Sequence, residues 1–144
     1  RTGNYHPNLT PYQVFECADG HIIIATGNDV QYRRLCSVLN LDDMAEDPKY
    51  LRNSDRIANR EDMTERLTER TKTFAKDSLL SACEDQGIPA GPINDMAEVF
   101  ADPQVIARGM KVELDGVPYV RSPFVFSDAD LTLNRGAPKL GEDN

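Results

Sequence analysis

The feature that most constrains the fold of this 144-residue chain is a pair of short apolar runs joined by an Asp-Gly turn. The runs are Pro11–Cys17 and His21–Thr26. An Asp-Gly turn between two such runs is typical of a β-hairpin, because glycine readily adopts a positive φ. The second run contains Ile22–Ala25, and this β-branched series predicts a strand buried on both faces.

A helical pattern follows the predicted hairpin directly. We expect Asn28 or Asp29 to cap the first helix, because a side-chain oxygen there can accept from the backbone of the first turn. Apolar residues then recur at helical spacing, namely Tyr32, Leu35, Cys36 and Leu39. Residues 42–59 are less regular. Further helices are predicted over residues 60–72, from a cap at Thr73 to Gly87, over 96–100 and over 104–108.

The last third of the chain has the pattern of strands. Apolar and charged residues alternate between Met110 and Asp115, a second Asp-Gly turn follows, and Val117–Phe126 is the predicted return strand. We expect a stiff turn at Ile88–Pro92 and an extended tail over residues 134–144. Together these patterns predict an α+β fold, a small and mostly antiparallel sheet with packed helices, in a single small domain over residues 1–144.

Charge and hydropathy exclude several classes of function. The net charge of −8 argues against nucleic-acid partners, because phosphate contacts need a basic face. No apolar run is long enough to span a membrane, and no targeting segment is recognisable, so the prediction is a cytoplasmic protein without membrane association. No Gly-rich phosphate-binding motif follows a strand, so the chain offers no dinucleotide site of its own.

Cysteine and histidine usage gives no reason to expect a metal site. The three cysteines, Cys17, Cys36 and Cys83, are widely spaced and form no Cys-x-x-Cys pair. They are predicted to be buried free thiols of a reducing compartment. The two histidines lie far from any cluster of cysteines or carboxylates, so no metal ligands are assigned.

Polar side chains of several types gather before and just after the hairpin. From the residues alone, each has a functional and a structural interpretation. His6 can orient a carboxylate or buffer a proton, or it is simply a loop histidine beside Pro7. Gln13 can reach a site or face outward from its strand, and Asp29 can approach a site or cap a helix. Asn53 and Arg56 are interpreted as groups that tie down a loop.

Eight short segments carry a family resemblance through their order and spacing along nearly the whole chain. They are Gly3–Pro7 (GNYHP), Pro11–Phe15 (PYQVF), Ala18–His21 (ADGH), Gly27–Tyr32 (GNDVQY), Asp47–Arg56, Gly87–Asn94 (GIPAGPIN), Asp102–Met110 (DPQVIARGM) and Ala137–Glu142 (APKLGE). In this order they resemble the family III CoA-transferases. That group contains formyl-CoA transferase, carnitine CoA-transferase and α-methylacyl-CoA racemase.

The resemblance implies the small domain of a two-domain enzyme. In that family a large Rossmann-like domain binds CoA and carries the aspartate that forms the aspartyl-CoA thioester. Nothing in this chain lines up with that aspartate, so no catalytic residue is assigned and the chain alone is expected to be inactive. The resemblance also implies an interlocked homodimer of the full-length protein, with the tail over residues 134–144 leading back to the large domain.

The resemblance further implies that segment 1–10 faces the substrate. A glycine-rich loop of formyl-CoA transferase covers the thioester and excludes water. The equivalent loop here, Gly3–Thr10, has one glycine and the bulkier Tyr5-His6-Pro7, which predicts a stiffer lid and an acyl group larger than formyl. Substrate contacts are expected from Asn4, His6, Gln13 and Asp29. Coenzyme A is expected as a substrate, with no further cofactor.

The predicted function is transfer of CoA from an acyl-CoA to a carboxylic acid by the full-length protein. One alternative lies within the same family: a 2-methylacyl-CoA racemase, which abstracts an α-proton. In that branch an acidic residue near the position of Asp29 approaches the active site. Another alternative comes from a different class, a stand-alone, non-catalytic binding module.

Overall fold

The structure is a computed structural model that describes residues 3–142. Internal contacts divide the chain into two units, one up to Ile93 and one from Asn94 onward. The prediction that residues 1–144 make one small domain therefore stays a prediction.

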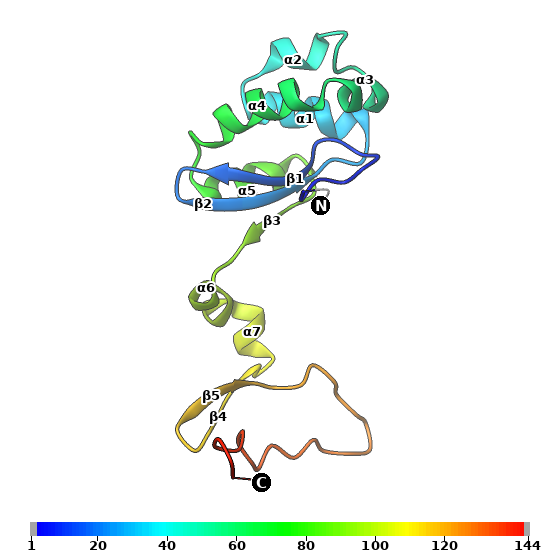
Figure 1. The fold of residues 1–144 in the computed structure, drawn as a ribbon. Helices are drawn as coiled ribbons and strands as arrows, with labels where there is room; N and C mark the ends of the chain where they lie inside the picture. The colour runs from blue at the N-terminus through cyan, green and yellow to red at the C-terminus, as the bar shows by residue number, and fades with distance from the viewer. Residues whose placement is uncertain (1–2, 143–144) are drawn as a thin grey trace. The chain divides into compact units, whose positions relative to one another are not determined.

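The first unit is a three-stranded sheet with helices packed against it (Figure 1). Its strands pair antiparallel in the order β1-β2-β3, α4 packs against β1, and α5 packs against β2 and β3. The elements are β1 (Tyr12–Cys17), β2 (Gly20–Ala25), α1 (Asp29–Val38), α2 (Asp42–Glu46), α3 (Asn53–Ala58), α4 (Arg60–Thr71), α5 (Lys76–Asp85) and β3 (Ala90–Ile93). This arrangement confirms the predicted α+β class.

The predicted hairpin is confirmed, with Phe15 opposite Ile22 in the register of β1 and β2. Ile22 and Ile24 are fully buried in the middle strand. Gln13 does not face outward from its strand, which was one of its two interpretations. Side chains alternate along a strand, so Gln13 shares the face of Phe15 and Cys17, and it is only 9% exposed.

Helix α1 follows its sequence pattern closely. The N-cap is Asn28, whose Oδ1 accepts from the backbone N–H of Gln31 at 2.9 Å, and Asp29 is the first helical residue. All four residues of the predicted apolar stripe are buried. The helix therefore presents one continuous face to the core, as the 3.6-residue period requires.

Two predictions between residues 42 and 87 need correction. The less regular region contains the short helices α2 and α3. Thr73 does not cap the next helix: its hydroxyl donates to the carbonyl of Arg70 at 2.8 Å, and α5 starts at Lys76 without a side-chain cap. A threonine next to a helix C-terminus can bond backward as readily as forward, and the sequence alone does not separate the two.

The predicted stiff turn at Ile88–Pro92 is also corrected, because most of it forms strand β3. Ala90–Ile93 pairs with His21–Ile24 of β2, with Pro92 opposite Ile22. Proline has no N–H group to donate to a neighbouring strand, so Pro89 and Pro92 indicated a turn in place of a strand. Because β3 lies at the edge of the sheet, it tolerates the missing N–H group.

The second unit has two short helices and a two-stranded hairpin: α6 (Met96–Ala101), α7 (Pro103–Ala107), β4 (Lys111–Leu114) and β5 (Val117–Val120). Asp95 caps α6 and Asp102 caps α7. Strand β5 ends at Val120, short of the predicted Phe126. Described residues 94–142 include no buried residue, since two helices and one hairpin enclose too little space for a core.

No described helix combines the length and apolar character needed to cross a bilayer. The predicted tail over residues 134–144 contains no helix or strand up to Glu142, and its last two residues lie outside the described part of the chain. Residues 1–2 of the predicted substrate-facing segment also lie outside it.

The buried cysteines lead to a prediction about thiol reactivity. Cys17, Cys36 and Cys83 are free and buried, as the sequence predicted. Burial raises the pKa of Cys36 and that of Cys83 to about 11. At pH 8 these two thiols are expected to react with a disulfide reagent about 100-fold more slowly in the folded chain than in urea, because the thiolate is the reacting form. Rapid labelling of either thiol in the folded chain, located by mass spectrometry, would contradict this burial.

Candidate functional site

The loop Gly3–Thr10, called the N-terminal loop below, runs along the free edge of β1. The backbone N–H of His6 donates to the carbonyl of Tyr12 at 2.9 Å. The backbone N–H of Val14 donates to Asn4 Oδ1 at 3.2 Å. Because β1 pairs with β2 on its other side only, these contacts satisfy edge groups that are otherwise left open.

His6 organises the middle of the N-terminal loop. Its Nδ1 accepts the backbone N–H groups of Asn8 at 3.1 Å and Leu9 at 3.0 Å. Its ring also stacks on Tyr12, with the ring centroids 5.1 Å apart. An Nδ1 that accepts hydrogen bonds carries no proton, so the N–H group of this ring is on Nε2.

Side chains from two helices hold the N-terminal loop in place. Asn53 of α3 accepts from the backbone N–H of Thr10 at 3.1 Å and donates to the carbonyl of Asn8 at 2.8 Å. Arg60, the first residue of α4, donates to the carbonyl of Pro7 at 3.0 Å. Its guanidinium also lies 4.5 Å from the ring centroid of Tyr5. The loop is therefore fixed at both its middle and its end.

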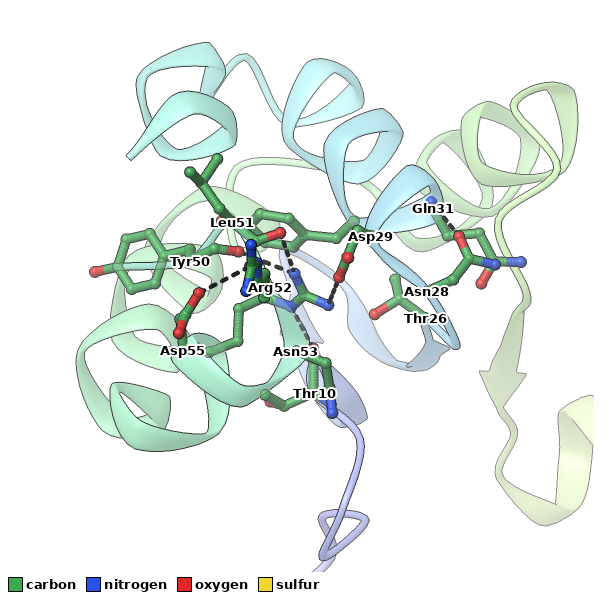
Figure 2. Close-up of polar contacts among 12 residues, drawn as sticks. Thr10, Thr26, Asn28, Asp29, Gln31, Tyr50, Leu51, Arg52, Asn53 and Asp55 are labelled. Carbon is green, nitrogen blue, oxygen red and sulfur yellow. Dashed lines mark hydrogen bonds and ion pairs between the residues drawn. The ribbon is translucent and has the colours of Figure 1, made fainter. Parts of the chain in front are cut away.

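Arg56 of α3 joins the end of the N-terminal loop to the start of α1. Figure 2 labels Thr10 and Asp29, the two residues that Arg56 joins. The Arg56 side chain is 1% exposed. The guanidinium donates to the carbonyl oxygens of Thr10 at 2.8 Å and Tyr50 at 2.9 Å, and it binds Asp29 Oδ1 at 2.8 Å. It also lies 4.5 Å from the ring centroid of Tyr32. The interpretation of Asn53 and Arg56 as residues that tie down a loop is thus confirmed.

Asp29 serves as the counter-ion of a buried arginine. It does not cap α1, because Asn28 provides the capping oxygen. One carboxylate oxygen is bound by Arg56, while the side chain as a whole stays 43% exposed. A carboxylate at the first turn of a helix is also favoured by the helix dipole. Asp29 is therefore fixed in position and still accessible from solvent.

The structure brings together only some of the residues predicted to contact substrate. Asn4 and His6 both lie along the edge of β1. His6 stacks on Tyr12, whose side chain leaves β1 on the face opposite that of Gln13. Gln13 is thus separated from His6 by the sheet itself. Asp29 is linked to the N-terminal loop through Arg56 and the carbonyl of Thr10.

Sequence reasoning missed Arg60 as a contact of the N-terminal loop. The available signal was spacing, because Arg56 and Arg60 are four residues apart and Asn53 lies three residues before Arg56. That pattern was obscured by the break between α3 and α4 at Asn59. Residues 3–142 contain no group of three or more histidine, cysteine or acidic side chains arranged to hold a metal ion.

Comparison with known proteins agrees with the resemblance expected from the sequence. Residues 1–144 match the family described as CoA-transferase family III. The chain is 45% identical over 147 residues to the succinate–glutarate CoA-transferase of Agrobacterium fabrum, covering 99% of this chain and 37% of that protein. It is 35% identical over 147 residues to the succinyl-CoA:glutarate CoA-transferase of Homo sapiens, covering 99% of this chain and 34% of that protein.

A solved structure gives the same result for the fold. A CAIB/BAIF family protein from Brucella suis superposes with a TM-score of 0.91 and 51% sequence identity, covering 99% of this chain and 38% of that one. The chain thus spans little more than a third of the length of these relatives, 37% in the first of them.

Proposed function

Since the chain belongs to CoA-transferase family III, we propose that the full-length protein transfers CoA from an acyl-CoA to a carboxylic acid. The observation that carries this proposal is the match to the family along residues 1–144, together with 45% identity to a relative named for such a transfer. The activity is proposed for a protein of the relatives' length, of which this chain corresponds to about a third.

The reaction is proposed to pass through an aspartyl-CoA thioester whose aspartate lies outside this chain. Attack of the aspartate carboxylate on the acyl-CoA releases the CoA thiolate and forms an anhydride, and attack of the thiolate on the aspartyl carbonyl then releases the donor acid and leaves the aspartyl-CoA thioester. The acceptor acid takes CoA by the same two steps in reverse, which regenerates the aspartate. Water competes at each activated carbonyl, so the site needs a cover. We assign that role to the N-terminal loop. In support, Asn53, Arg56 and Arg60 hold it from outside and His6 holds it from within.

The acid is proposed to be dicarboxylic. The two curated relatives are named for succinate and glutarate, which both carry two carboxylates. One carboxylate takes CoA, and the other stays ionised throughout the reaction. Asn4, His6 and Asp29 are proposed to contact substrate, whereas the buried position of Gln13 suits a packing role better. Coenzyme A as a substrate, an interlocked homodimer and a cytoplasmic location remain parts of this proposal.

An exchange assay tests the proposed function on the full-length protein. Succinyl-CoA and glutarate are expected to give glutaryl-CoA and succinate in equal amounts, without net loss of thioester, as chromatography would measure. The 144-residue chain alone is the negative control and is expected to give no exchange. If no acid accepts CoA, but 2-methylacyl-CoA exchanges its α-proton with deuterated water, the full-length protein is a racemase and not a transferase. If neither reaction is detected, the remaining candidate is the non-catalytic binding module.

A further inference from the structure

In the N-terminal loop, Asn4 and His6 each use a side-chain acceptor and keep a side-chain donor. Asn4 accepts the N–H of Val14 at its Oδ1, so its Nδ2 group points elsewhere as a donor. His6 accepts two N–H groups at Nδ1, so Nε2–H is its remaining polar group. Within residues 3–142, neither Asn4 Nδ2 nor His6 Nε2 has a hydrogen-bond partner.

Local charge also suits an anion. Residues 3–11 contain no acidic residue, although the whole chain carries a net charge of −8. Within the described part of the chain, the side chains that hold the loop from outside are those of Tyr12, Asn53, Arg56 and Arg60. Two of these are cationic and none is acidic. Within residues 3–142, the one carboxylate that an ion pair links to this set is Asp29, which Arg56 binds.

We propose that Asn4 and His6 bind the second, non-reacting carboxylate of the dicarboxylic acid. This inference rests on the proposed function. A carboxylate only accepts hydrogen bonds, and these two side chains are left only with donors. Hydrogen bonds to a charged group are stronger than those between neutral groups, so the two contacts favour a diacid over a monoacid of the same length.

This assignment makes His6 a hydrogen-bond donor through Nε2–H. Nδ1 is already occupied, because the N–H groups of Asn8 and Leu9 both point at that atom. The ring is held in one tautomer by the fold before any substrate binds.

Two substitutions separate ligand binding from loop structure. Asn4→Asp keeps an oxygen for the N–H of Val14 but replaces the outward NH₂ by a carboxylate oxygen, which repels an anion. His6→Asn keeps an acceptor near the position of Nδ1 but removes the Nε2–H donor. Asn134→Asp is the matched control, since it adds the same negative charge at an exposed residue outside the loop.

The test is a competition in which the full-length protein and its variants receive one acyl-CoA donor with glutarate and valerate together. The measured quantity is the ratio of kcat/KM for glutarate to that for valerate, in which effects on the donor cancel. Asn4→Asp is expected to lower this ratio about 100-fold and His6→Asn about 10-fold, given the strength of hydrogen bonds to charged groups. Asn134→Asp is expected to leave it unchanged.

The outcomes distinguish this inference from the proposed function. If the unaltered protein transfers CoA, but the ratio is near one or neither loop variant lowers it, the second-carboxylate site is refuted and the transferase stands. If the unaltered protein forms no new thioester, both fail together. A second measurement does not depend on turnover: ¹⁵N NMR of His6 in the 144-residue chain is expected to show the Nε2–H tautomer, and the Nδ1–H tautomer would refute the assignment.

Discussion

Replacement of Arg56 by methionine is expected to lower the free energy of unfolding of the 144-residue chain by about 3–5 kcal/mol. Methionine keeps an unbranched apolar side chain, so the decrease in the free energy of unfolding comes mainly from removal of the guanidinium group. Without it, the carbonyl oxygens of Thr10 and Tyr50 lose their charged donor in a buried setting. Asp29 contributes less to the loss, because its exposed oxygen can be solvated.

Urea unfolding followed by circular dichroism measures this loss. The control is Arg33→Met, the same change on the exposed face of α1, which is expected to alter the free energy of unfolding by no more than about 0.5 kcal/mol. A loss below about 1 kcal/mol for Arg56→Met would mean that the guanidinium contacts contribute little net stability. The N-terminal loop would then need another anchor.

The second large effect is expected for Phe15→Ala in β1, which should lower the free energy of unfolding by about 3–5 kcal/mol. Phe15 is 1% exposed and packs on the core face of the sheet, opposite Ile22 in register. Truncation removes most of an aromatic side chain from a close-packed interior, and the strand cannot collapse into the cavity because both of its edges are bonded.

The matched control for Phe15→Ala lies in the second unit. Phe126 is 56% exposed, and Phe126→Ala is expected to change the free energy of unfolding by no more than about 0.5 kcal/mol. The same urea titration measures both variants. A cost for Phe126→Ala close to that for Phe15→Ala would show that the second unit buries apolar surface in solution, contrary to its exposure here.

The elements that the sequence predicted best have local causes. The β1–β2 hairpin follows from two apolar runs around Asp19-Gly20, and α1 follows from the Asn28 cap and the stripe from Tyr32 to Leu39. Each pattern lies within some ten to fifteen residues, so no distant contact was needed to recognise it. The family resemblance was equally accessible, because it rests on the order of short segments, and the match along residues 1–144 confirms it.

The elements that were missed depend on distant partners. Ala90–Ile93 becomes a strand because β2 offers it an open edge, although Pro89 and Pro92 argue locally for a turn. Gln13 lies on the core face because the register of Phe15 and Cys17 places it there. Local polarity suggested the opposite. In both cases a tertiary contact outweighed the preference of the residue itself.

For the candidate site, the sequence by itself determined the residue types: an acid-free N-terminal loop with Asn4 and His6, followed by Asp29 at the start of a helix. Only the tertiary structure decided which polar atoms of those residues are left without a hydrogen-bond or ion-pair partner. The edge of β1 and the backbone of the loop occupy Asn4 Oδ1 and His6 Nδ1, and Arg56 occupies one oxygen of Asp29. The physical reason is that a buried or edge backbone group takes the nearest side-chain partner, and that choice depends on which strands and helices meet.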